Sequence, residues 1–141
     1  MKPGGGRLKG AQYERQIAGV LFDLIGVKFK RDLEQYRSAE RGDLVADDPD
    51  FPFTIECKRY ASGSTARPGW WEQACIAARS QGKWPALVYR FDRSDTRVRV
   101  LLETLLTKYS GSGAWIEMPI QTFGILASEL MGEKPNGIDV R

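Results

Sequence analysis

The chain has 141 residues, of which 42% are hydrophobic and 28% charged, and its formal net charge at pH 7 is +3. This length suits one compact domain that buries its own core, and no apolar run reaches the roughly 18 residues that a membrane helix needs. The sequence contains no histidine, which excludes hydrolases that use an imidazole base and zinc sites built on histidine.

The first predicted elements are a flexible arm and a helix. Residues 1–10 are basic and rich in glycine, which is typical of a mobile arm. From Ala11 onward, apolar residues recur at helical spacing, and Gly26 ends the predicted helix. Glu14 falls at the edge of this apolar stripe, so its carboxylate is expected to point toward the interior of the fold.

Three short strands are predicted next. Residues 27–31 alternate like a strand, and a charged loop runs from there through Arg41. The segment GDLVA (42–46) predicts a short strand, and DDPDFP (47–52) predicts a turn built from Asp and Pro. Residues 53–59 predict a strand that pairs with GDLVA as a hairpin.

The second half of the chain continues the alternation of helices and strands. A loop over 61–69 leads into a predicted helix at 70–82, and an apolar run at 85–91 predicts a central strand. The remaining predicted elements are a strand at 97–102, a short helix at 101–109, an edge strand at 114–118 and a helix at 120–131, before a polar tail at 132–141. This order predicts an α/β fold over residues 11–131, in which a central mixed sheet is flanked by helices.

The cysteines and the N-terminus bear on the compartment. Cys57 and Cys75 have neither CxxC nor zinc-finger spacing, so we expect reduced thiols, with Cys57 packed in the core. The basic N-terminus is not followed by the hydrophobic stretch of a secretory signal. We therefore expect a cytoplasmic protein.

Charge is unevenly distributed along the chain. Residues 1–41 hold nine Lys or Arg and five Asp or Glu, residues 42–56 hold five acids and no base, and residues 57–100 hold nine bases and three acids. A basic excess favours a polyanionic partner. Binding to phosphate gains nothing from a concentrated group of acids, so the acidic segment indicates a separate role.

The stretch FTIECKRY (53–60) carries two opposite charges on one side of a strand. Successive side chains of a strand point to opposite faces, so Glu56 and Lys58 share a face. On an antiparallel neighbouring strand, Asp43 can lie across from Glu56. Two carboxylates that close repel each other, and a hard cation such as Mg²⁺ would remove the repulsion. Lys58 could then orient the attacking water or stabilise developing charge, and Glu14 could bind the same ion directly or through water.

These residues match a known pattern. Glu14, the pair GD at 42–43 and the string IECKR (55–59) resemble the PD-(D/E)xK nuclease superfamily. Within it, the first 60 residues or so are most similar to archaeal-type Holliday-junction resolvases and their phage-borne relatives. The resemblance implies a restriction-endonuclease-like core, a homodimer, and a phage enzyme that acts in the host cytoplasm. It also implies Mg²⁺-dependent cleavage, with Mn²⁺ as a substitute, that leaves 5′-phosphate and 3′-hydroxyl ends.

The resemblance implies a role for each residue of the motif. Asp43, Glu56 and the Cys57 carbonyl would be metal ligands, Lys58 the catalytic lysine, and Glu14 an auxiliary acid that reaches the same metal. The proline-aspartate pair of the family is not kept, because a glycine precedes Asp43, but the carboxylate remains in place.

Residues around the motif predict further contacts. Gln73, on the helix after the motif, is either a polar group of the active site or an exposed helix glutamine. Trp70 and Trp71 either stack on DNA bases or pack at the start of this helix. Six basic residues near the motif are expected to contact DNA phosphates, or else to be solvated surface charge: Arg7, Lys9, Arg37, Arg41, Arg59 and Arg67.

The sequence thus predicts a structure-selective endodeoxyribonuclease that acts on branched DNA, in particular on four-way junctions. Two alternatives use the same active site, namely a flap or single-strand nuclease and a restriction-like enzyme; no base-reading helix stands out to support the second. From a different class, a non-catalytic DNA-binding module would use Glu56 and Lys58 as an ordinary salt-bridged pair. The C-terminal third carries little net charge, which favours it as the dimer contact.

Overall fold

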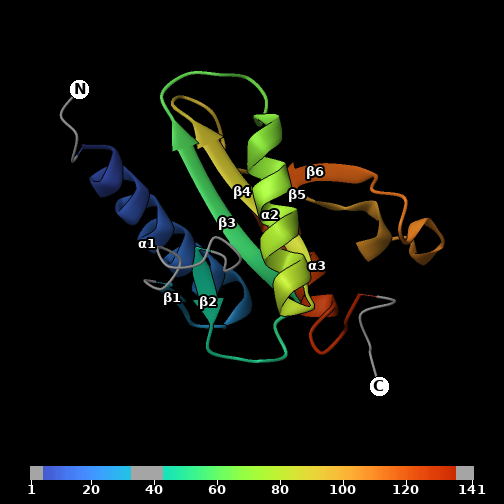
Figure 1. Ribbon diagram of the computed structural model, residues 1–141. Coiled ribbons are helices and arrows are strands. Elements are labelled where there is room, and N and C mark those ends of the chain that lie inside the picture. The colour runs from blue at the N-terminus through green and yellow to red at the C-terminus, as the bar shows by residue number, and fades with distance from the viewer. Residues whose placement is uncertain (1–4, 33–42, 136–141) are drawn as a thin grey trace.

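A six-stranded mixed sheet forms the centre of the computed structural model, which describes residues 5–32 and 43–135 (Figure 1). The strands follow one another across the sheet in chain order, β1 to β6. Every neighbouring pair is antiparallel except β3 and β4, which run parallel. The strands are β1 (Phe29–Arg31), β2 (Leu44–Ala46), β3 (Phe53–Tyr60), β4 (Trp84–Phe91), β5 (Arg97–Leu101) and β6 (Trp115–Pro119).

Helices cover both faces of the sheet. They are α1 (Gly5–Ile25), α2 (Pro68–Gln81) and α3 (Ile120–Glu129), with two 3₁₀ turns, η2 (Leu102–Thr104) and η3 (Thr107–Tyr109), between β5 and β6. Helices α1 and α3 share one core with the strand side chains of their face, where the rings of Phe53 and Phe123 lie 4.9 Å apart. Helix α2 covers β3 and β4 on the other face through Trp70 and Ala74 (Figure 1). Among the described helices, none is long and apolar enough to cross a membrane.

The parallel pair follows from the connection between its strands. Helix α2 carries the chain from the end of β3 back to the start of β4, and such a crossover returns the second strand in the same direction as the first. Strand β4 is covered by helices on both faces, which is why its sequence is a nearly continuous apolar run. The carboxyl ends of β3 and β4 therefore lie side by side at one end of the sheet, where the motif on β3 finishes.

The predicted fold class, a mixed sheet flanked by helices, is confirmed, while several element boundaries differ from prediction by a few residues and two differences are larger. Helix α1 begins at Gly5 rather than at Ala11, so part of the predicted flexible arm is helical. Extending a helix that is already packed adds one hydrogen bond for each residue fixed, which offsets the weak propensity of glycine. The predicted helix at 101–109 is instead the pair η2 and η3, and the Thr104 hydroxyl donates to the Leu101 carbonyl at 2.8 Å within the first of them.

Candidate active site

The four charged residues of the motif come from three neighbouring elements. Asp43 directly precedes β2, Glu56 and Lys58 lie on β3, and Glu14 lies on α1. Strand β2 pairs with β3 through Leu44 opposite Ile55, so the next pair outward sets Asp43 opposite Glu56, as the hairpin predicted.

Asp43 is fixed by the backbone of β3 on both sides of Glu56. The Asp43 N–H donates to the Ile55 carbonyl at 2.8 Å, and the Cys57 N–H donates to Asp43 Oδ2 at 2.7 Å. The side chain of Asp43 is therefore held toward the strand by a buried, charge-assisted hydrogen bond.

Asp43 and Glu56 are buried side by side, and Glu14 is buried close enough to raise the pKa of both. Glu56 is 0% exposed, Asp43 6% and Glu14 8%. Within the described part of the chain, neither carboxylate oxygen of Glu56 has a hydrogen-bond partner. A buried acid with both oxygens unsatisfied is costly unless a cation or a proton compensates it.

The electrostatics agree with this geometry. Burial, and then the neighbouring charge of Asp43, raise the pKa of Glu56 from 4.5 to about 9. Burial also raises the pKa of Asp43 from 3.8 to about 6, with Glu14 adding to the shift, while the hydrogen bond from Cys57 and the charge of Lys58 oppose it. At neutral pH the pair thus retains a proton that a bound divalent cation would displace.

The donor set fits Mg²⁺ better than a metal that needs many protein ligands. In residues 5–32 and 43–135, no three His, Cys, Asp or Glu side chains are grouped so as to hold a metal on their own. Mg²⁺ is usually bound by one or two carboxylates and keeps several waters. Asp43 and Glu56 supply two such carboxylates, and the Glu56 oxygens are free to bind.

Lys58 lies two residues after Glu56 on β3. It is half-buried, it shares the face of Glu56, and its positive charge lowers the pKa of both Asp43 and Glu56. The described residues include no acid that forms an ion pair with it. Its ammonium group is therefore available to an anionic ligand, unlike that of a salt-bridged surface lysine.

Arg31 is a member of the site that the sequence did not reveal. Arg31 Nε donates to Glu14 Oε1 at 2.8 Å, and both side chains are largely buried. The pair joins the end of β1 to α1, and it fixes the direction of the Glu14 carboxylate. Alternation in residues 27–31 predicted a strand but not which helical residue lies beside it.

Two further predicted residues lie near the motif without joining the cluster. Gln73 lies on α2, half-buried and one turn after Trp70, and among the described residues it makes no hydrogen bond to Asp43, Glu56 or Lys58. The Cys57 side chain packs in the core on the opposite face, where burial raises the pKa of its thiol well above the ordinary value. The prediction that Cys57 is a reduced core residue is confirmed.

The predicted DNA-contacting residues fall into three groups. Arg59 lies on the face opposite Lys58 and pairs with Asp92 at 3.1 Å, whereas Arg67 is exposed at the start of α2 on the Lys58 face. Arg37 and Arg41 lie outside the described residues. Arg7 and Lys9 lie in the first turns of α1, but their side chains are also outside the described part.

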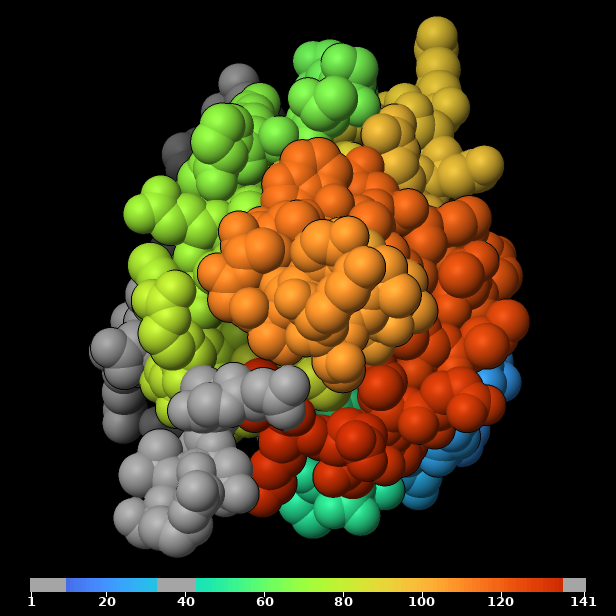
Figure 2. Space-filling model, turned by 90° about the vertical axis from the view of Figure 1, so that its right-hand side faces the viewer, coloured from blue at the N-terminus to red at the C-terminus, as the bar shows by residue number. Residues whose placement is uncertain are grey.

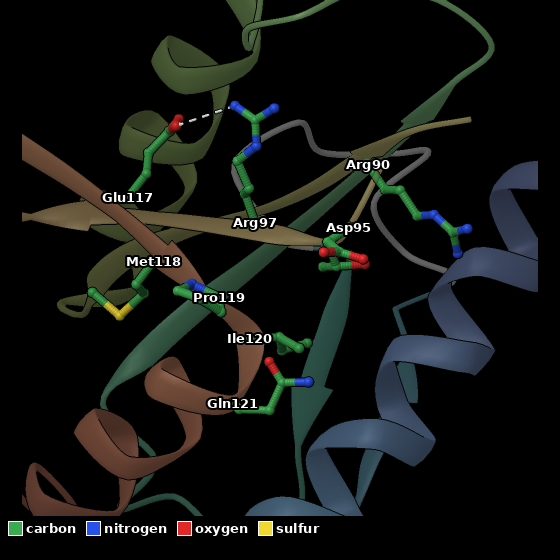
Figure 3. A pocket seen from close by; sticks show the side chains of 9 residues that line it. Arg90, Asp95, Arg97, Glu117, Met118, Pro119, Ile120 and Gln121 are labelled. Atoms are coloured by element: carbon green, nitrogen blue, oxygen red, sulfur yellow. Dashed lines mark ion pairs between the residues drawn. The ribbon is translucent and has the colours of Figure 1, made fainter. Parts of the chain in front are cut away.

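The motif lies outside a hollow on the β4–β6 side of the sheet. That hollow has a volume of about 640 Å³ and lies between the β4–β5 turn, the end of β6 and the start of α3 (Figure 3). Arg90, Arg97 and Gln121 are among its lining residues, and Glu117 points toward Arg97 across it (Figure 3). Asp43, Glu56 and Lys58 are not among its lining residues and lie on β3 and directly before β2.

Fold and site together define a class. A mixed sheet in which one strand carries Glu56 and Lys58, and its antiparallel neighbour brings in Asp43, is the core of the restriction-endonuclease-like, PD-(D/E)xK nucleases. The family described as "Phage putative PDDEXK endonuclease" matches residues 5–131, and the chain belongs to it.

A solved structure supports the fold. The 1.6 Å structure of Hjc from Archaeoglobus fulgidus, described as a Holliday junction resolvase from an archaeal hyperthermophile, is similar with a TM-score of 0.50 and 22% sequence identity. The similarity covers 64% of this chain and 70% of that one. No curated protein matches the chain.

Proposed function

We propose that the protein is a Mg²⁺-dependent, structure-selective endodeoxyribonuclease that cuts four-way DNA junctions and leaves 5′-phosphate and 3′-hydroxyl ends. The observation that carries the proposal is the pair Asp43 and Glu56. They are buried side by side, the Glu56 oxygens have no partner among the described residues, and Lys58 lies beside them without an ion pair. A structural salt bridge would join the Glu56 carboxylate to the Lys58 ammonium group, and no such ion pair is found among the described residues.

Each residue has a proposed task. Asp43 and Glu56, together with the Cys57 carbonyl, hold the ion, and the Asp43–Cys57 hydrogen bond keeps the first carboxylate in place. Mg²⁺, or Mn²⁺ in its stead, would supply Lewis-acid polarisation of the scissile phosphate and a more acidic water. Lys58 orients that water and stabilises the charge that builds up on the phosphate. Glu14, fixed by Arg31, adds negative charge next to the ion and acts as the auxiliary acid.

Branched DNA is the proposed substrate. The fold similarity to a protein described as a Holliday junction resolvase supports it. Junction cleavage requires two symmetric cuts, so we also propose a homodimer. Four exposed apolar side chains in the segment between β5 and β6 and at the start of β6 support a contact there: Leu105, Leu106, Tyr109 and Trp115. Figure 2 shows this segment as a raised area of the surface.

One cleavage experiment tests the proposal. The protein is incubated with a synthetic four-way junction, a matched duplex, a flap and a single strand, in Mg²⁺ or in EDTA. Asp43→Asn, Glu56→Gln and Lys58→Ala are run in parallel. We expect paired symmetric nicks on the junction alone, lost in EDTA and reduced at least 100-fold in each variant.

The other outcomes separate the alternatives. If flaps or single strands are cut while the junction stays intact, the proposed substrate is wrong and the proposed active site stands. DNA binding that is indifferent to Mg²⁺ and to Asp43→Asn, without cleavage of any substrate, would mean a DNA-binding module and would refute the enzyme proposal.

A further inference from the structure

An aromatic surface follows the catalytic motif on the same face of β3. Tyr60, the last residue of this strand, alternates in step with Glu56 and Lys58 and is 39% exposed. At the usual rise of about 3.3 Å for each residue, its Cα lies about 7 Å beyond that of Lys58 and about 13 Å beyond that of Glu56. A DNA strand bound at the motif would therefore pass Tyr60 within a few nucleotides of the cut.

Tyr60 is part of a compact group with Trp70 and Arg67, which we call the Tyr60 platform. The rings of Tyr60 and Trp70 are stacked, 4.9 Å apart at an interplanar angle of 29°. The Arg67 guanidinium lies 4.4 Å from the Tyr60 ring centroid and 5.3 Å from that of Trp70. A sandwich with Tyr60 in the middle would put Arg67 almost twice as far from Trp70. Arg67 and Trp70 therefore do not sandwich the Tyr60 ring between them, and the tyrosine keeps 39% of its surface exposed.

The platform has a rigid base. Trp70 is 6% exposed and packs on the buried rings of Tyr89 and Phe91, with centroids 6.1 Å and 5.8 Å away. The loop that leads to Arg67 is held down on the same base. At Gly63, where φ is +145°, an added Cβ would come within 2.4 Å of the Phe91 ring.

Among the described residues, Arg67 forms no ion pair with an acid. Arg31, Arg59 and Arg99 each form an ion pair with a carboxylate, whereas the Arg67 guanidinium lies over the rings of Tyr60 and Trp70. An exposed guanidinium over an aromatic ring contributes about 0.5–1 kcal/mol, so the contact alone is a weak reason for this arrangement. A guanidinium without an acidic partner among the described residues, beside a partly exposed aromatic ring, is suited to a nucleotide, whose base stacks while its phosphate binds the cation.

We propose that the Tyr60 platform receives an unpaired nucleobase a few nucleotides from the scissile phosphate. Both faces of a base in continuous duplex are covered by its neighbours, whereas a base at a branch point can leave the stack at little cost. The platform would thus favour branched or single-stranded DNA over duplex. The proposal rests on the proposed nuclease site, since that site brings the strand to Tyr60.

The test measures binding in EDTA, so that it does not depend on cleavage. The affinity of the protein for a four-way junction is compared with its affinity for junctions that carry one abasic nucleotide, moved stepwise through the five positions on either side of the branch point. Stacking of one base is worth about 1–3 kcal/mol, which predicts a loss of about 5- to 150-fold at one or two positions. Tyr60→Ala is expected to lose as much on the intact junction and nothing further on the abasic one, and Tyr60→Phe should behave like the wild type.

Two outcomes would overturn the platform. One is an abasic scan without effect at any position. The other is a loss in Tyr60→Ala that is equal on intact and abasic DNA, which would mean a structural or phosphate-binding role. A phosphate contact by Arg67 alone would lower the slope of log affinity against log salt by about one in Arg67→Ala, with no dependence on the base.

Matched controls keep the result interpretable. Melting temperatures show whether each variant is folded, and Glu72→Ala, an exposed residue on α2, should match the wild type in affinity. If the protein cuts DNA in a metal-dependent way, but neither Tyr60→Ala nor an abasic site changes its affinity for the junction, the Tyr60 platform proposal is refuted and the nuclease proposal stands. If junction affinity depends on the base as predicted but no substrate is cleaved, the nuclease proposal is refuted and the Tyr60 platform proposal stands.

Discussion

At the level of single residues, burial of the Glu56 carboxyl group makes the stability of the fold depend on pH. This carboxyl group is fully buried beside Asp43, and its pKa is raised from 4.5 to about 9. Between these pH values the folded protein holds a proton that the unfolded chain has released. The protonated form stabilises the fold fully below pH 4.5, and this contribution is lost as the pH rises to 9. Asp43 acts in the same direction between 3.8 and about 6.

A glutamine at position 56 removes this pH dependence. In EDTA we expect Glu56→Gln and the wild type to melt at similar temperatures at pH 5. At pH 8 to 9 the variant should melt several degrees higher, since each kcal/mol of unfolding free energy shifts the melting temperature by about 2–4 °C. Mg²⁺ should raise the melting temperature of the wild type at pH 8 and have little effect on the variant. Calorimetry at several pH values checks both points. Parallel curves for the two proteins would mean that Glu56 is not strained by burial.

The Glu14–Arg31 pair lends itself to a double-mutant cycle. Because the pair is partly buried, Arg31→Met should lower the free energy of unfolding by about 1–3 kcal/mol, and Glu14→Gln should lose a comparable amount. Combined, the two changes should cost less than the sum of the single ones, since neither charge is then left alone. Chemical denaturation measures this coupling. Strict additivity would contradict a direct interaction.

A matched control and an activity measurement sharpen that cycle. Arg59→Met removes an arginine whose pair with Asp92 is exposed, so it should cost less than 1 kcal/mol. Glu14→Gln should reduce turnover while junction affinity stays nearly unchanged. A large loss of affinity instead would assign Glu14 a structural role.

At the level of elements, the hairpin of β2 and β3 was the most predictable part of the site. Period-two alternation alone put Glu56 and Lys58 on one face, and the short turn after GDLVA set Asp43 opposite Glu56, as the strand register confirms. Contacts between elements distant in the sequence could not be read this way. The ion pair of Glu14 with Arg31 and the stacking of Tyr60 on Trp70 depend on how α1 and α2 cross the sheet.

The loop between β3 and α2 provides a prediction at this level, with a glycine pair as its control. Gly63→Ala would place a Cβ against the buried Phe91 ring and require a positive φ, so we expect a loss of about 1–3 kcal/mol of stability. The shifted loop should also lower junction affinity about as much as Arg67→Ala does. Gly69→Ala, in the first turn of α2, meets no atom within 4 Å and should keep both stability and affinity. Equal behaviour of the two variants in thermal melts and binding titrations would contradict a close approach at Gly63.

At the level of the whole molecule, the two ends of the sheet have different surfaces. The edge strand β1 pairs with β2, which Asp43 directly precedes, so the proposed catalytic pair lies on the β1 side of the sheet. At the other edge, the apolar segment that contains η2 and η3 directly precedes β6 (Figure 1). A dimer contact through β6 would leave the opposite side of each subunit, which carries the proposed active site, facing outward. The two active sites of the proposed dimer could then reach two strands of one junction.

The dimer proposal predicts a change of mass and of cutting pattern together. Leu105 and Leu106 are 52% and 49% exposed, and burying such side chains in a partner is favourable, whereas a charge there is not. We expect the wild type to sediment as a dimer and Leu105→Glu/Leu106→Glu as a folded monomer. Ile125→Glu, at a side chain 68% exposed on α3, should remain dimeric. Since each monomer still carries Asp43, Glu56 and Lys58, the monomeric variant should nick one strand at a time and lose the paired cuts on a cruciform plasmid. A wild type that sediments as a monomer, or paired cuts that survive the double substitution, would show that this surface does not couple two active sites.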